Sequence, residues 1–141
     1  MQNTTKRLLM RAHSPSNTDA LRKWSNDPEI QDLTCDTPSH VSHSDMTSRM
    51  GRWLAGPDDA EHWAIHLRSS AQLIGFIQIV FIDSVHRRCK FGLVIGDRRE
   101  WGKGLGREAL AWLCRHCFDD LKLNRVSAEV LCHNKRSFNL L

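Results

Sequence analysis

Three glycines alternate with other residues just before an apolar, helix-like run: Gly102, Gly104 and Gly106 in the segment WGKGLG. Glycine has no Cβ atom, so an anion can approach the backbone amides closely. A helix that begins here adds unpaired N–H groups and the positive end of its dipole. Lys103 and Arg107 add positive side chains on either side. The residue types and spacing therefore predict a binding site for a phosphate or pyrophosphate.

Two other phosphate-binding motifs do not fit this segment. A Walker loop requires GxxxxGK[ST], whereas Lys103 is followed by Gly104. A dinucleotide fingerprint requires GxGxxG, and here the second interval is one residue short. Plain helix capping is the simplest alternative, but a single glycine would serve it.

The elements that must position this turn follow an α/β pattern, with a loop-like segment at 32–44. The predicted elements are a strand at 6–11, helices at 17–27 and 44–54, strands at 61–68, 73–82 and 89–95, a helix at 105–118, a strand at 126–131 and a helix starting at 134. Tight turns join the middle strands and a helix joins the last two. We therefore expect a mixed central sheet flanked by helices.

Bulk composition indicates a single domain of 141 residues with a mild net charge of +4. No long apolar run is present, so neither a signal peptide nor a membrane partner is expected. Five cysteines, an odd number, favour reduced thiols and a cytoplasmic location. Cys114 and Cys117 form a CxxC, with Cys132 and His133 further on, so a metal site is conceivable. A buried structural role fits their amphipathic helix better, and we expect no metal.

The segment FGLVIGDRREWGKGLGREAL at 91–110 resembles the acetyl-coenzyme A motif of the GNAT superfamily of N-acetyltransferases. Gly104 and Gly106 match the last two glycines of that motif, while Trp101 replaces its Gln or Arg. The WGKG form resembles the RimJ/RimL-like branch, which acetylates protein N-termini, nucleotide-sugar amines, polyamines or drugs. The segments TKRLLMR, 19–30 and 123–141, with Asn134 and Ser137 in the last, also resemble that branch. The resemblance covers nearly the whole chain.

This resemblance implies the GNAT acyl-CoA N-acyltransferase fold and direct transfer of an acetyl group from acetyl-CoA, the co-substrate, to a primary amine of a protein N-terminus or small molecule. In the family, the strand before the turn splays at a bulge and pairs with pantetheine, and 94–96 match that place. Asn134 could bind pantetheine or cap the last helix. The residues expected to bind acetyl-CoA are Val94, Ile95, Gly96, Trp101, Gly102, Lys103, Gly104, Leu105, Gly106, Arg107, Asn134 and Ser137.

The catalytic groups are not identified by the resemblance. Lys90 stands where many relatives carry a glutamate base, and Leu141 where many carry a tyrosine acid. The remaining candidates are Asp83, Ser137, His66 and His86, and a water-relayed proton would need none of them.

The acceptor is expected near 32–54. Trp53, Asp36, His40 and His43 could line its site there, and a solvated loop is the alternative.

The family normally continues through two more strands after the point where this sequence stops. We therefore expect a single N-acetyltransferase domain, 1–141, that is incomplete at its C-terminus and lacks the last two strands. Its fifth strand would have an open edge, which a homodimer or another chain could complete.

Two rival functions remain. A non-catalytic acyl-CoA-binding module would explain the replaced catalytic positions. A basic nucleic-acid binder would use Arg87, Arg88 and Lys90, but no reading motif accompanies that charge.

Overall fold

The computed structural model describes residues 3–34 and 39–140, and its centre is a five-stranded sheet in the order β1-β2-β3-β4-β5. The first four strands are antiparallel, and β5 lies parallel to β4. The strands are β1 Leu8–Ala12, β2 Glu61–Leu67, β3 Leu73–Asp83, β4 Arg88–Ile95 and β5 Arg125–Ser127, and the α-helices are α1 Thr18–Ser25, α2 Pro28–Thr34, α3 His43–Leu54, α4 Leu105–Arg115 and α5 Lys135–Leu140. The predicted mixed sheet flanked by helices is confirmed.

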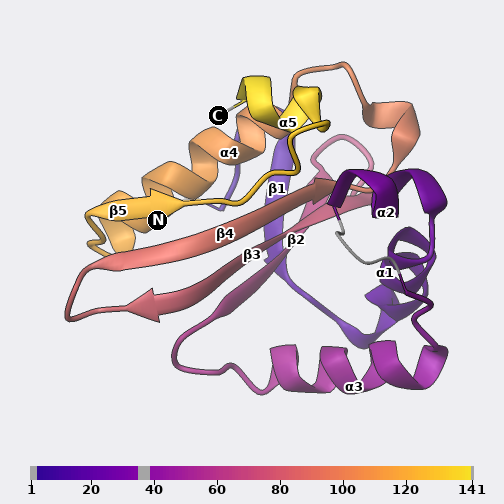
Figure 1. The fold of residues 1–141 in the computed structure, drawn as a ribbon, viewed down its shortest axis with the longest axis horizontal. Helices are drawn as coiled ribbons and strands as arrows, with labels where there is room; N and C mark the ends of the chain where they lie inside the picture. Colours follow the sequence, from indigo (N-terminus) through magenta and orange to yellow (C-terminus); the bar gives the residue numbers. More distant parts are fainter. Residues whose placement is uncertain (1–2, 35–38, 141) are drawn as a thin grey trace.

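The two faces of the sheet carry different helices because successive side chains of a strand point to opposite sides. Ile77 and Ile79 of β3 pack in one core cluster with Trp112 and Leu113 of α4. Phe76 packs on the other face with the buried residues of α1 and α3. Figure 1 shows α2 beside the end of β4, with α1 and α3 following below it, and the long β3–β4 hairpin extending away from these helices. The glycine turn after β4 thus lies near this helical cluster.

Helix α2 corrects the sequence interpretation, which placed the end of one helix at Asp27 and a loop from 32. Asp27 instead caps a new helix, because its Oδ1 accepts hydrogen bonds from the N–H groups of Glu29 at 2.9 Å and Ile30 at 3.4 Å. Pro28 occupies the first helical position, which suits its fixed φ and missing N–H. Burial of Ile30 then anchors the helix to the protein.

Strand β5 is also shorter than predicted. It pairs with β4 only from Arg125 to Ser127, and the following residues at 128–131, of which Ala128, Val130 and Leu131 are apolar, leave the sheet. Helix α4 ends at Arg115 rather than 118 and continues as a π-helical turn, His116–Asp120. The apolar pattern identified both segments but not where their hydrogen bonding changes.

The π-helical turn places the buried His116 between two carboxylates, the half-buried Glu61 and the exposed Asp120. His116 Nε2 lies 2.7 Å from Glu61 Oε1, and His116 Nδ1 lies 3.0 Å from Asp120 Oδ2. The Trp63 indole donates to Glu61 at 2.9 Å, and the Trp112 ring stacks on His116. Burial alone lowers the pKa of His116, but the hydrogen bonds to the two carboxylates outweigh it and raise that pKa. The bond from His116 lowers the pKa of Glu61 against the opposing effect of burial.

This cluster predicts a pH-dependent stability. Because the pKa of His116 is raised in the folded state, its contribution is complete below the ordinary value of 6.5 and is lost as pH rises through the folded pKa. Glu61 acts in the opposite sense, and its contribution is lost as pH falls through its lowered pKa. We expect His116→Gln to lower the free energy of unfolding by about 2 kcal/mol near pH 6, the scale of a hydrogen bond to a charged group. Urea unfolding at several pH values should show the difference from wild type shrinking toward pH 9, and a growing difference would contradict this account.

Among the helices of the described part of the chain, none is long and apolar enough to cross a bilayer.

Candidate functional site

Strands β4 and β5 are hydrogen-bonded only along the first part of β4. Their pairing ends at Lys90 and Ser127, so the segment 91–95 has no strand beside it on that edge within the described residues. The Gly96 N–H donates to the Ile74 carbonyl at 2.8 Å. The alternation of an antiparallel pair then directs the backbone polar groups of Leu93 and Ile95 away from β3, toward the gap.

The gap opens without a bulge at this point. The pairing of β3 with β4 is regular from Gly75/Ile95 to Val80/Lys90, and its register shift lies at the far end, between Val80 and Asp83. The family resemblance predicted a bulge at 94–96, and this prediction is wrong because the irregular pairing lies at the opposite end of β4. The early departure of β5 separates the strands instead.

A cavity of about 690 Å³ occupies this gap. Its walls are the edge of β4, the chain leaving β5, the glycine turn, and parts of α2 and α5. The residues expected to bind the cofactor that line it are Val94, Ile95, Trp101, Gly102, Gly104, Leu105, Gly106, Arg107, Asn134 and Ser137. Residues from two distant segments thus meet at one cavity.

The glycine turn presents bare backbone to this cavity. Gly102 has φ +77° and Gly104 has φ +80°, a left-handed conformation that glycine adopts without strain. Gly104 is the N-cap of α4, and the N–H of Glu108 makes the first bond of that helix, to the Gly104 carbonyl at 3.1 Å. The N–H groups of 105–107 precede this bond, so they are available to an anion.

Arg7 braces the turn from the other end of the chain. Its Nη1 donates to the Lys103 carbonyl at 2.8 Å, and its Nε donates to Glu108 Oε1 at 2.9 Å. Glu108 also accepts from the Thr5 hydroxyl, so the carboxylate in the first turn of α4 is fully occupied. Sequence reasoning missed Arg7 because the contact spans about a hundred residues and no local pattern signals it.

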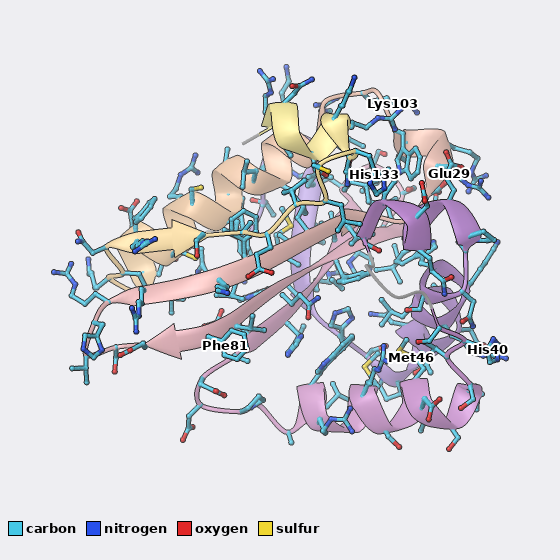
Figure 2. The ribbon with its side chains drawn as sticks, in the orientation of Figure 1. Glu29, His40, Met46, Phe81, Lys103 and His133 are labelled. Carbon is cyan, nitrogen blue, oxygen red and sulfur yellow. The ribbon has the colours of Figure 1, made fainter. Side chains whose placement is uncertain are left out.

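Gly96 and Lys103 were expected in the site but do not line the cavity. A Cβ at Gly96 would lie 2.1 Å from Cδ2 of Trp24, so this glycine makes room for a buried indole of α1. Lys103 Nζ pairs with Glu100 at 3.1 Å. Figure 2 shows Lys103 at the turn, on the same side of the molecule as Glu29 of α2 and His133.

Trp101 and Arg136 form one corner of the cavity. The Trp101 Nε1 donates to the Ile95 carbonyl at 2.6 Å, and the Arg136 guanidinium lies 4.8 Å from the centre of its ring. The departure from the Gln or Arg of the motif thus places an indole that ties the turn to β4. Arg136, which sequence reasoning missed, joins Arg107 as a second cation of the cavity.

Asn134 links the two helices that flank the cavity. Its Oδ1 accepts from the Ser137 N–H at 3.2 Å, and its Nδ2 donates to the Leu33 carbonyl at 2.9 Å. His133 Nε2 lies 2.6 Å from the Asp32 carbonyl, which adds a second tie to α2. Asn134 was considered either as a ligand of pantetheine or as the cap of the last helix, and the structure contains the capping hydrogen bond.

The proposed base Asp83 lies outside the cavity. It sits in the β3–β4 turn, where it accepts from the N–H groups of Val85 and His86 and from the His86 ring. The bond from the His86 N–H lowers the pKa of Asp83, which makes it a weaker base. His86 shares that turn. Lys90 pairs with Glu129 at 2.8 Å, at the end of the cavity away from the glycine turn.

A second cavity of about 320 Å³ lies between α1, α3 and β3. Of the residues considered for the acceptor site, Trp53 lines this cavity, His40 and His43 are exposed and do not, and Asp36 lies outside the described residues. Gln78 lines both cavities. Its side chain lies over Gly92, where a Cβ would come within 3.3 Å of Gln78 Cγ and Nε2. Sequence reasoning missed Gln78, and its signal was one polar residue in the apolar run LIGFIQIVFI.

Cys89 and Cys117 are buried core residues, Cys114 is half-buried and Cys132 is exposed. Cys117 is fully buried, and burial raises the pKa of its thiol and that of Cys114. Within residues 3–34 and 39–140, no group of three or more His, Cys, Asp or Glu side chains is placed to hold a metal ion.

Comparison with known proteins bears directly on this site. Residues 7–141 match the family model described as acetyltransferase (GNAT) domain. A curated relative, uncharacterized N-acetyltransferase p20 of Bacillus licheniformis, is 31% identical over 138 residues, which are 97% of this chain and 77% of the relative.

Solved structures share the fold. Spermidine N-acetyltransferase from Vibrio cholerae, in complex with CoA and spermine, superposes with a TM-score of 0.86 at 18% identity, over 96% of this chain and 78% of that one. A GNAT acetyltransferase from Bacillus anthracis gives 0.84 at 18% identity, over 99% and 80%.

Proposed function

The chain belongs to the GNAT acetyltransferase family, and from that membership we propose that it transfers the acetyl group of acetyl-CoA to a primary amine of a protein N-terminus or small molecule. The single observation that carries this proposal is the 690 Å³ cavity, in which a bare glycine turn and an open strand edge face the same space. The WGKG form of the turn supports a place in the RimJ/RimL-like branch. CoA bound to the Vibrio cholerae neighbour supports the choice of co-substrate.

The glycine turn would hold the pyrophosphate of the co-substrate. The N–H groups that precede the first bond of α4 would donate to it, and the helix dipole adds a favourable field. Arg107 and Arg136 would supply side-chain charge, while Arg7 keeps the competing carboxylate of Glu108 occupied.

The open edge of β4 would hold the pantetheine arm. An amide-bearing chain can pair with an exposed strand edge as an added strand, and Leu93 and Ile95 direct their N–H groups into the gap. A backbone N–H there would also stabilise the negative charge that develops on the thioester oxygen.

The chemistry then requires a neutral amine held near the thioester carbon. The amine nitrogen forms a bond to the carbonyl carbon, the carbon–sulfur bond breaks, the proton lost by nitrogen passes to water, and the thiolate takes a proton from water. No carboxylate is needed for this sequence. Positioning of the two reactants would supply most of the rate gain.

Two measurements on the intact chain test the proposed function. Calorimetry should detect binding of acetyl-CoA, and a thiol-release assay should detect free CoA when an amine panel is added. Binding without release for any amine would favour the non-catalytic module instead. A folded chain that binds no acetyl-CoA would overturn the proposal.

Gln78 provides a separate prediction. Because it lies between the two cavities, its amide is placed to hydrogen-bond the incoming amine or the acetyl oxygen. We expect Gln78→Leu to lower kcat about tenfold, the scale of one lost hydrogen bond of about 1.4 kcal/mol, while the Kd for acetyl-CoA changes less than about threefold. Steady-state kinetics with calorimetry check this, and an equal loss in Kd and kcat would indicate a merely structural role.

A further inference from the structure

Resting on the proposed function, we propose that the amine acceptor carries an anionic group, a phosphate or carboxylate, which Arg49 and Arg52 of α3 bind. Both arginines line the second cavity beside Gln78. Their spacing of three residues places them on neighbouring positions of one helix face. The preference for an anion follows from the charges around this cavity.

Among the residues that the structure describes, no carboxylate lines this cavity to offset its positive charge. Its other lining residues are uncharged: Leu21, Ser25, Met46, Trp53, Phe76 and Gln78. Within the described residues, neither arginine forms an ion pair. The charge of Arg49 acts on Asp45, one turn earlier, but that carboxylate accepts from the Ser42 N–H in the capping box of α3. Within the described residues, the two guanidiniums on this helix face thus form no ion pair with a carboxylate.

The imidazole rings of His13 and His62 lie beside Trp53 and cannot supply a negative charge to balance the two arginines. The Trp53 ring stacks on the His62 ring with 4.6 Å between ring centroids, and its centroid lies 5.3 Å from that of the His13 ring. Burial lowers the pKa of His13 to about 4, with repulsion from His62 and His66 acting in the same direction, so this ring is neutral at pH 7. Burial likewise lowers the pKa of His62. The walls offer a flat aromatic surface and cationic donors, a combination suited to an acid group on a compact acceptor.

A polycationic acceptor would be repelled by the same surface. Spermine, present in the Vibrio cholerae neighbour, is a polyamine whose charges would face two arginines here. The field of the arginines has a second effect, because nearby positive charge disfavours an ammonium and lowers the pKa of the acceptor amine. The arginine pair thus selects the acceptor and favours its reactive neutral form.

Matched acceptors test this inference through thiol release at saturating acetyl-CoA. O-phosphoethanolamine and ethanolamine differ by one phosphate, β-alanine and β-alaninamide differ by one carboxylate, and spermidine represents polycations. We expect kcat/KM for an anionic member to exceed that of its neutral partner about tenfold or more, with spermidine poorest. Tenfold corresponds to about 1.4 kcal/mol. The phosphate and carboxylate pairs distinguish the two anionic groups.

Variants assign the preference to the arginines. In the double variant Arg49→Gln/Arg52→Gln, the anionic advantage should disappear while the Kd for acetyl-CoA stays within about threefold of wild type. Arg115→Gln, which removes an exposed arginine of α4, is the matched control and should keep the advantage. Preferred use of spermidine, equal use of the matched acceptors, no use of either anionic amine despite acetyl-CoA binding, or a preference that survives in the double variant would each overturn the inference. So would a double variant that loses acetyl-CoA binding, because the arginines would then belong to the cofactor site. Absence of acetyl-CoA binding by wild type would instead overturn the proposed function.

Discussion

We expect Gly104→Asp to raise the Kd for acetyl-CoA by about 100-fold or more, a loss of about 2.7 kcal/mol. Gly104 stands at the N-cap of α4 with φ +80°, on the wall of the larger cavity. An aspartate there would place a carboxylate where the pyrophosphate is expected, so two anions would compete for the same N–H groups. A Cβ at this position would meet only Arg7 Nη2, at the ordinary contact distance of 3.5 Å, so the protein should remain folded. Calorimetry with acetyl-CoA measures the effect.

Gly56→Asp is the matched control for this variant. Gly56 also has a positive φ, +69°, and no atom lies within 4 Å of the position its Cβ would take. It lies outside both cavities. Strain from a left-handed aspartate is thus similar in the two variants, and only Gly104→Asp should lose affinity. Equal Kd values for the two variants would refute the glycine turn as the pyrophosphate site.

Gly96→Ala should lower the free energy of unfolding by about 2–3 kcal/mol, at the upper end of the overpacking range. The new Cβ would lie 2.1 Å from Trp24 Cδ2 and 2.4 Å from Cε2, and a rigid indole has no flexible end to move aside. Trp24 is buried in the cluster that joins α1, α2 and α3, so the whole cluster would have to shift. Chemical denaturation measures the loss.

Two further variants locate the cause of that loss. Gly51→Ala in α3 meets no atom within 4 Å and should be neutral or stabilising by up to about 1 kcal/mol, because alanine favours a helix. In a Trp24→Leu background, Gly96→Ala should cost clearly less than in wild type, since the clashing ring is gone. An unchanged cost would show that backbone conformation, not the indole, requires glycine at 96.

The sheet and the glycine turn could be predicted because both depend on local sequence. Alternation marks β2, a continuous apolar run marks β3, and the bare turn is a feature of six consecutive residues. Helix α2 escaped prediction because Asp27 can end one helix or begin the next, and its capping bonds decide between them. The end of β5 was misplaced because the apolar residues Ala128, Val130 and Leu131 would fit either a strand of a sheet or the wall of a cavity.

The other roles that could not be predicted from the sequence depend on hydrogen bonds and contacts that only the folded chain reveals. Gly96 matched the cofactor motif by position, but its role against Trp24 depends on a helix more than seventy residues earlier. Arg7 reaches the turn through the same kind of distant contact. Asp83 satisfied the chemistry of a base, and only its turn hydrogen bonds reveal that it serves the hairpin. Residue type identifies what a side chain can do, whereas topology decides where it does it.

The meeting of the two cavities at Gln78 has a kinetic consequence. Apart from Gln78, the described residues that line the two cavities are different, so the two reactants can be bound at the same time. Among the residues at 3–34 and 39–140, no cysteine, lysine or histidine lines either cavity, so no strong nucleophile from that part of the chain is placed to carry the acetyl group between two half-reactions. Double-reciprocal plots should therefore intersect rather than run parallel, the signature of a ternary complex in place of a ping-pong cycle.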